Sequence, residues 1–407
     1  MSEKIVHVVG GGLAGSESAY QIAQAGYDVV LHEMRPIVKT DVHETDKFAE
    51  LVCSNSLKSV DLKNASGLLK KELTDLDSFV LKIANKHAID GGKALVVDRE
   101  TFSEEITSII ESHPKIHVQR EEITEISPDD FWIIATGPAT SEKLYKWIMT
   151  KFKTGSHFFD AVAPIIDATT IDMSKIFLAN RYEDKGKDYF NCPMNKDEYL
   201  QFRENLVNAE VLPMEKFDRK LLFSRCQPIE EIARSGIDAM RYGPLRPVGL
   251  ELNGKRPYAV VQLRRDNYAG TLLNIVGFQT RLKWPEQQRV FRMIPGLENV
   301  KIVRYGVMHA NIYIEPSKVT DEFFRSKTME NLFFAGQITG VEGYVESIAT
   351  GLYVGRNVVR ILNGLDPERF PCNTMIDSLI DYVTKAKDLQ PMYANFGILK
   401  KTLEIGD

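Results

Sequence analysis

The sequence predicts an α/β fold in which a doubly wound domain is interrupted by an inserted α+β domain. Three observations indicate this fold class. The chain opens with a buried strand, a glycine-rich turn and a helix. A strand that ends in small residues returns at 331–337, and short, proline-rich elements occupy much of the stretch between. We therefore expect a discontinuous first domain, 1–145 and 300–407, and an inserted domain, 146–299.

Length and composition fit this organisation. With 407 residues and 46.1 kDa the chain exceeds what one hydrophobic core serves, and its 43% apolar and 26% charged residues are typical of globular proteins. No apolar run approaches the length of a membrane span, so we expect no membrane contact. The four cysteines form no CxxC pair, which argues against a metal site. Without a signal peptide they predict reduced thiols and a cytoplasmic protein.

The start of the chain has the pattern of a Rossmann-type dinucleotide site. Residues 5–9 are an apolar, β-branched strand, and Gly10-x-Gly12-x-x-Gly15 follows directly. The glycines allow a tight turn and a close approach of pyrophosphate to a helix N-terminus, while Glu33 ends the next strand, where it can accept from ribose hydroxyls. The residues that we expect to bind the dinucleotide here are Gly10, Gly12, Leu13, Ala14, Gly15, Glu33, Met34 and Arg35.

Two later strands favour FAD over NAD. Residues 131–137 form an apolar strand that ends in Ala-Thr-Gly, which resembles the corresponding strand of glutathione-reductase-type flavoproteins. The strand at 331–337 leads into a glycine-rich stretch that opens a long helix, and a second helix N-terminus suits the phosphates of FAD. An ordinary parallel strand with a glycine-rich turn is the alternative. The residues predicted to line this half of the FAD site are Ala135, Thr136, Gly137, Gly336, Gln337, Gly343 and Tyr344.

Between these strands, the long segment 36–62 follows the second strand, so it should lie over the carboxyl edge of the sheet, near the flavin ring. Leucines and other apolar residues spaced by three and four then predict one helix over 66–86. The first domain is expected to resume near 301.

The inserted stretch carries a basic segment. Although the net charge of the chain is −5, residues 241–283 hold eight basic and only two acidic residues. A local basic surface can bind a polyanion because phosphate contacts act locally, whereas the alternative is a solvated strand face with scattered charges. The residues predicted to contact RNA are Arg246, Lys255, Arg256, Arg264, Arg265, Arg281 and Lys283.

Several long motifs resemble one family nearly end to end. They include TDKFAELVCSNS, SRCQPIE, GPLRPVGL, IPGLENVKIVRYGVMH and FFAGQITGVEGYVES. These look like the folate- and FAD-dependent tRNA uracil-C5 methyltransferases (TrmFO), which are related to the wobble-uridine flavoproteins (MnmG, or GidA). The resemblance implies a glutathione-reductase-type FAD domain with an inserted domain, and an enzyme that uses 5,10-methylenetetrahydrofolate as the methyl donor and NAD(P)H as the reductant.

The implied reaction has a connected set of chemical requirements. Uracil C5 is a poor nucleophile, and a thiolate that adds to C6 activates C5 to attack an electrophilic methylene. The methylene carbon must then be reduced to a methyl group, and a reduced flavin can deliver that hydride. FAD, a folate pocket, a thiol and an RNA-facing surface therefore belong together. The product is 5-methyluridine.

Two cysteines occupy the cysteine motifs of the family. The resemblance implies that Cys226 attacks C6 and that Cys53 acts on the flavin side, although the two roles could be exchanged. An ordinary thiol with a pKa of about 8.5 is only partly ionised at pH 7, so each needs a cation or a helix N-terminus nearby. For Cys53 we expect a helix to begin just after Asn55 and Ser56. The alternative is that both thiols are buried and inert.

The resemblance also implies that His309 stacks on the folate pterin ring. Two positions depart from the family pattern: Ala310 stands where an arginine is usual, and Lys93 stands where a glycine is usual. These departures leave the RNA target open. The expected target is the T-loop of tRNA; the alternatives are a uridine of 23S rRNA, or a non-catalytic paralogue that binds FAD and RNA.

Overall fold

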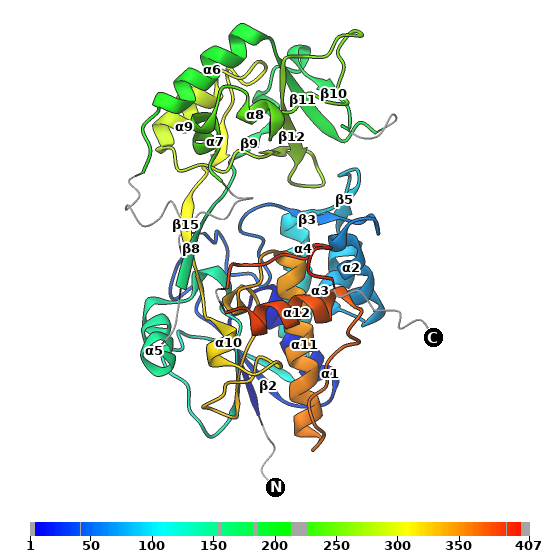
Figure 1. Cartoon of the computed structure of the whole chain (residues 1–407), viewed down its shortest axis with the longest axis vertical. Coiled ribbons are helices and arrows are strands. Elements are labelled where there is room, and N and C mark those ends of the chain that lie inside the picture. Colours follow the sequence, from blue (N-terminus) through cyan, green and yellow to red (C-terminus); the bar gives the residue numbers. More distant parts are fainter. Residues whose placement is uncertain are drawn as a thin grey trace.

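The computed structural model describes residues 5–40, 42–153, 156–181, 186–212, 227–387 and 389–399, with the backbone alone at 156–161 and 308–310. The chain forms two bodies joined by a two-stranded ribbon (Figure 1). One body is built on a five-stranded sheet with helices packed on it, and the other on a six-stranded sheet. None of the helices in these ranges combines the length and the apolar character that crossing a membrane requires.

The five-stranded sheet has the order β16-β7-β1-β2-β6, and every neighbouring pair is parallel. Its strands are β1 (Val6–Val9), β2 (Val29–Glu33), β6 (Ile116–Arg120), β7 (Phe131–Ile134) and β16 (Leu332–Phe334). The strand order reverses direction at β1, because β2 lies on one side of it and β7 on the other. Ligands of open α/β sheets bind at the carboxyl edge of such a reversal. This confirms the predicted fold class.

Two helices that are far apart in sequence pack side by side on this sheet, α1 (Leu13–Gln24) and α11 (Tyr344–Leu362). Glycines permit the close approach: a Cβ built on Gly351 would stand 2.4 Å from the Ala14 carbonyl oxygen, and one on Gly355 would stand 3.1 Å from the Ser18 Cα. The two helices follow β1 and β16, so both begin at the carboxyl edge of the sheet.

The single helix predicted over 66–86 is wrong, because the structure has two, α2 and α3 (Ala65–Asp75 and Phe79–Lys86). The chain turns at Asp77, whose φ of 52° is left-handed. Ser78 then caps the second helix by accepting from the Leu81 amide, while the buried carboxylate of Glu17 accepts from the Ser78 hydroxyl. The apolar spacing continued across the break and concealed it.

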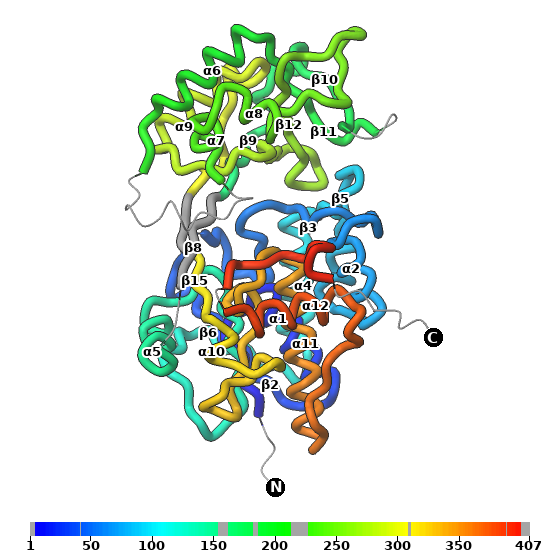
Figure 2. The backbone as a smooth tube through the Cα atoms, viewed as in Figure 1, coloured from blue at the N-terminus to red at the C-terminus, as the bar shows by residue number. Residues whose placement is uncertain are grey.

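A small sheet lies on the side of this body that faces the inserted domain. Its order is β3-β5-β4, with β3 (Ser56–Ser59), β4 (Ala88–Ile89) and β5 (Ala94–Val97). Figure 2 shows β3 and β5 between the main sheet and β12 of the inserted domain. The remaining helices of this body are α4 (Arg99–Ser112), α5 (Glu142–Phe152), α10 (Pro316–Val319) and α12 (Met375–Lys385).

The inserted domain is an antiparallel sheet of order β10-β11-β12-β13-β9-β14. Apolar side chains of the sheet pack with those of the helices in one core. The strands are β9 (Ile165–Asp167), β10 (Phe177–Leu178), β11 (Tyr189–Met194), β12 (Ala259–Arg265), β13 (Leu272–Ile275) and β14 (Ile302–Arg304). The helices are α6 (Lys196–Asn208), α7 (Ile229–Ser235), α8 (Ala239–Tyr242) and α9 (Trp284–Phe291).

The two bodies are joined by β8 (Ser156–Ala161) and β15 (Met308–Tyr313), which pair antiparallel (Figure 1). The chain passes from one body to the other at two points, and both lie later in the sequence than the boundaries expected at 146 and 299. Helix α5 continues to Phe152 and packs against Phe334 of the first body, while β14 still pairs with β9 of the inserted sheet. The sequence did not reveal the first boundary, because an amphipathic helix such as α5 has the same residue pattern whichever domain it packs against.

Candidate functional site

A cavity with an empty volume of about 930 Å³ lies at the carboxyl edge of the five-stranded sheet; we call it the dinucleotide cavity. It is lined by residues that follow β1, β2, β7 and β16, so the reversal of the strand order opens it. The predicted FAD residues that line it are Gly10, Gly12, Leu13, Ala14, Glu33, Met34, Arg35, Ala135, Thr136, Gly137, Gly336, Gln337 and Tyr344.

The glycines of the first turn have different tasks. Gly10 has a φ of +100°, and a Cβ there would lie 2.7 Å from the Ala135 carbonyl oxygen. A Cβ on Gly15 would lie 1.8 Å from the Gly10 carbonyl oxygen, so this glycine closes the turn. A Cβ on Gly12 would meet nothing within 4 Å, and Gly12 caps α1 at the wall of the cavity. The open space at Gly12 is where a pyrophosphate fits against the helix N-terminus.

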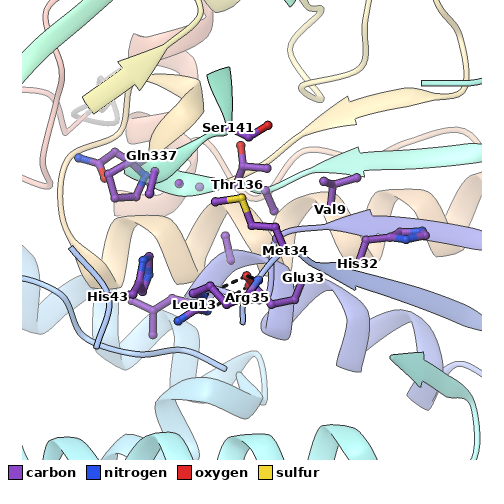
Figure 3. A pocket seen from close by; sticks show the side chains of 18 of the residues that line it. Val9, Leu13, His32, Glu33, Met34, Arg35, His43, Thr136, Ser141 and Gln337 are labelled. Atoms are coloured by element: carbon purple, nitrogen blue, oxygen red, sulfur yellow. Dashed lines mark hydrogen bonds and ion pairs between the residues drawn. The ribbon is translucent and has the colours of Figure 1, made fainter. Parts of the chain in front are cut away.

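The carboxylate of Glu33 is 5% exposed and is held from both sides. It accepts from the Gly11 amide at 2.9 Å and from the backbone amide of Arg35 at 3.0 Å. It also accepts from the guanidinium of Arg35 at 3.0 Å, twice (Figure 3). Burial raises the pKa of Glu33, but the hydrogen bonds and charge of Arg35 outweigh it and hold the pKa below its ordinary value. A fixed, ionised carboxylate at this position is suited to accept from ribose hydroxyls.

The loop after β2 folds back over the cavity. Arg35 donates to the Thr45 carbonyl oxygen at 3.0 Å and to Glu50 at 3.2 Å, and Phe48 packs so closely on Gly11 that a Cβ there would clash. His43 lines the same cavity, where burial and the charge of Arg35 lower its pKa to about 4. The imidazole is therefore neutral at pH 7.

Cys53 sits at the end of this loop, where the dinucleotide cavity meets a second hollow of about 980 Å³, the Cys53 cavity. The amides of Cys53 and Ser54 donate to the Tyr344 hydroxyl at 2.8 and 3.1 Å, although the first pair is 291 residues apart in the chain. The two cavities share walls at Val52, Pro138, Gln337, Tyr344 and Ser347. A flavin ring in one cavity and a substrate in the other can therefore meet beside this thiol.

The helix expected just after Asn55 and Ser56 does not form, because these residues lead into strand β3. A cation stands near Cys53 instead. The guanidinium of Arg99 donates to the Leu51 carbonyl oxygen, and it is within Coulombic range of the Cys53 sulfur. Sequence reasoning missed Arg99, because it lies at the start of a different helix.

The inserted domain closes the other side of the Cys53 cavity. Arg99 forms an ion pair with Asp266 at 2.9 Å, and the side-chain amide of Asn55 donates to the carbonyl oxygens of Val97 and Arg265 at 3.0 and 2.9 Å. The Asn55 oxygen accepts from the Nε of Arg264 at 3.2 Å. The segment that carries Cys53 is thus fastened to both bodies of the molecule.

The basic residues predicted to contact RNA over 241–283 do not form one exposed face. Arg264 and Arg281 are 7% and 4% exposed: Arg264 lines the Cys53 cavity, and Arg281 pairs with Glu231 of α7. Arg265 pairs with Asp90 at 3.2 Å and Lys283 with Glu210 at 2.7 Å. Of the seven predicted RNA contacts, Lys255, Arg256 and Lys283 are exposed, and Arg246 and Arg265 are half-buried. Basic residues cluster in this sequence because several are used in internal ion pairs.

Two predicted residues cannot be placed in the site. Cys226 lies outside the described residues, and the side chain of His309 does too, although its backbone pairs with Asp160 in the connecting ribbon. Of the other thiols, Cys192 is fully buried in the inserted core, where burial raises its pKa, and Cys372 is exposed. No group of His, Cys, Asp and Glu within the described ranges is arranged to hold a metal ion.

Fold and cavity together define a dinucleotide-binding α/β protein with an inserted antiparallel domain. The family profile of glucose inhibited division protein A (GidA) matches residues 5–366. The methylenetetrahydrofolate–tRNA-(uracil-5-)-methyltransferase TrmFO of Fervidobacterium nodosum is 57% identical over 398 residues, which is 97% of this chain and 93% of the relative. That of Thermosipho africanus is 54% identical over the same shares. The chain therefore belongs to the TrmFO family.

A solved structure shows the same fold at lower identity. Aquifex aeolicus GidA superimposes with a TM-score of 0.71 and 17% identity, over 94% of this chain and 68% of that one. The likeness extends through both bodies of the molecule, so the inserted domain is part of the shared architecture.

Proposed function

We propose that this protein is an FAD-dependent methylenetetrahydrofolate–tRNA uracil-C5 methyltransferase that makes 5-methyluridine in the T-loop. The proposal is carried by one observation: the loop that covers the dinucleotide cavity ends in Cys53, where that cavity opens into a second one walled by the inserted domain. Relatives more than half identical over nearly the whole chain carry this activity in their names.

The residues of the dinucleotide cavity fit FAD. The open space at Gly12 receives a phosphate, Glu33 is fixed and ionised for a ribose, and the N-terminus of α11 offers a second set of free amides. FAD, when bound, supplies the hydride that turns a methylene carbon into a methyl group. The loop bearing Phe48 and His43 limits the access of water to that region.

In this proposal the two thiols divide the work. Cys226 adds to C6 of the target uracil, which makes C5 nucleophilic toward the folate methylene. Cys53, beside the guanidinium of Arg99, then takes the C5 proton or handles the methylene adduct. His309 stacks on the pterin. A thiol mechanism needs reduced cysteines, so we place the reaction in the cytoplasm, with NAD(P)H as the source of electrons.

The test uses RNA that contains 5-fluorouracil, from which C5 cannot lose fluorine as a cation, so the thiol adduct is trapped. With methylenetetrahydrofolate and a reductant, the wild type should give a shifted band on a denaturing gel. Cys226→Ala should abolish both the shift and methylation. Cys53→Ala should abolish methylation and keep the shift. Flavin content should remain near the wild-type level in both variants, which controls for folding.

The outcomes separate the alternatives. A shift kept in Cys226→Ala and lost in Cys53→Ala exchanges the two roles. A wild type without shift and without methylation of tRNA or 23S rRNA transcripts would establish a non-catalytic paralogue. Methylation of the 23S rRNA transcript alone would keep the chemistry and change the target.

A further inference from the structure

A third hollow lies along the same interface, about 680 Å³ in empty volume, and we call it the junction cleft. One wall is the turn before β5, with Gly91, Gly92 and Lys93; the other is the inserted domain, with Arg181 and Tyr189. The Tyr189 hydroxyl reaches the Gly91 carbonyl oxygen at 3.5 Å across the interface. The cleft is therefore built from both bodies of the molecule.

Arg181 is the unusual group in this cleft. One of its terminal nitrogens donates to the Pro244 carbonyl oxygen at 3.0 Å, but its Nε is buried and has no hydrogen-bond partner among the described residues. Burial and the nearby charge of Arg246 lower its pKa to about 10. Arg181 forms no ion pair with an acid within the described part of the chain. Because a buried charge without a counter-charge is costly, its Nε and its charge are suited to hold an external anion.

Lys93 adds a second cation at the opposite wall. Among the described residues Lys93 pairs with Asp61, at 4.0 Å, and the Lys93 side chain is 55% exposed, so this pair holds it weakly. Gly92, with a φ of +60°, lines the cleft without a side chain, and a Cβ there would lie 3.3 Å from the Asn180 amide nitrogen. Of the described acids around this turn, Asp188 already accepts from Asn180 at 2.7 Å, and Asp90 pairs with Arg265 at 3.2 Å.

The cleft is in line with the Cys53 cavity. Strand β3 supplies Lys58 to the Cys53 cavity and Ser59 to the cleft, and β12 supplies Arg264 to the first and Gln262 to the second. Two residues of a strand span roughly 7 Å, so the two hollows are neighbours along one seam. A chain molecule that places one unit in the Cys53 cavity places an adjoining unit at the cleft.

We propose that the junction cleft binds a backbone phosphate of the substrate RNA, next to the nucleotide whose base enters the Cys53 cavity. This assignment rests on the proposed function. Arg181 donates to the phosphate from a fixed position, while Lys93 contributes a mobile charge from the exposed wall. The phosphate contact positions the RNA without reading its sequence.

The test compares Arg181→Gln, Lys93→Gly and the double variant with the wild type. A fluorescein-labelled tRNA transcript is titrated by fluorescence anisotropy at several salt concentrations, with FAD-loaded protein. The double variant should bind about tenfold more weakly, and the log–log salt slope should fall by roughly 0.7–0.9, as one lost phosphate contact predicts. Arg289→Gln removes an exposed arginine that pairs within α9, so it should change neither quantity.

The outcomes distinguish three roles for the cleft: binding an RNA phosphate, binding the folate, or a structural role alone. RNA binding equal to wild type with a raised KM for methylenetetrahydrofolate would assign the cleft to the folate carboxylates instead. Equal RNA binding and equal KM would make Arg181 purely structural. If Arg181→Gln loses its flavin and does not fold, Lys93→Glu on the exposed wall replaces it, and an unchanged salt slope in that variant overturns the proposal. A wild type that binds no RNA contradicts the proposed function itself.

Discussion

The dinucleotide cavity and the Cys53 cavity are adjacent but are built in different ways. The first depends on a turn of six residues, Gly10 to Gly15, and on an acid at the end of the next strand. The second joins the segment 52–58, which runs into strand β3, to the start of α11 and to strand β12 of another domain. A local site is formed by backbone conformation, whereas a composite site depends on the contacts that hold its parts together. Substitutions should therefore affect the two cavities differently.

The largest effect is expected at the turn of the dinucleotide cavity. Gly15→Ala places a methyl group 1.8 Å from the Gly10 carbonyl oxygen, so the turn cannot close and stability should fall by more than about 4 kcal/mol. Gly12→Ala meets no protein atom, and it should fold but bind FAD some 10–100-fold more weakly. Thermal unfolding and flavin titration measure both. Equal stability of the two variants would contradict the conclusion that Gly15 closes the turn whereas Gly12 leaves space for the pyrophosphate.

The next largest effect is expected at the Arg99–Asp266 ion pair, which joins the two bodies beside the Cys53 cavity. Arg99→Gln leaves Asp266, which is 3% exposed, without its partner, and this should cost about 3–5 kcal/mol. The cost should appear as a lower melting temperature, with FAD affinity changed less than methylation. Arg360→Gln, which breaks a more exposed ion pair with Glu368, is the matched control and should cost under about 1 kcal/mol. A uniform loss of FAD binding in Arg99→Gln would show that the cavities are not separable.

A smaller effect is pH-dependent and lies in the covering loop. The pKa of His43 is lowered to about 4 in the folded state, so between about pH 4 and 6.5 the unfolded chain binds the extra proton. Stability from this group therefore rises with pH through that window and is lost as pH falls. His43→Gln should flatten the rise by up to roughly 3 kcal/mol. Urea unfolding at pH 4 and pH 7.5 measures it; an unchanged difference in His43→Gln contradicts the neutral imidazole.

The smallest effects belong to the basic surface of the inserted domain. Lys255→Gln and Arg256→Gln alter exposed side chains, so each should weaken RNA binding a few-fold without changing the melting temperature. Arg281→Gln, by contrast, should lower the melting temperature because its ion pair with Glu231 is buried. RNA affinity that falls equally in all three, at constant stability, would restore the simple view of 241–283 as one RNA-binding face.

Local physical chemistry was sufficient for the dinucleotide half of the molecule. A β-branched run must be buried, Gly10 requires a backbone that other residues avoid, and the acid at Glu33 follows from the length of a strand–helix–strand unit. The same rules predicted that a glycine-rich stretch opens a second helix, and α11 begins within that stretch, at Tyr344. These features depend on neighbours within a few tens of residues.

The three-dimensional packing decided the rest, because it depends on partners remote in sequence. Nothing near Asp77 announces a left-handed turn, which is held by Glu17 from another helix. The charge beside Cys53 comes from Arg99 and not from a local helix N-terminus. Whether an arginine binds an external phosphate or an internal carboxylate depends on which acids the fold brings within reach, and a count of charges along the chain does not contain that information.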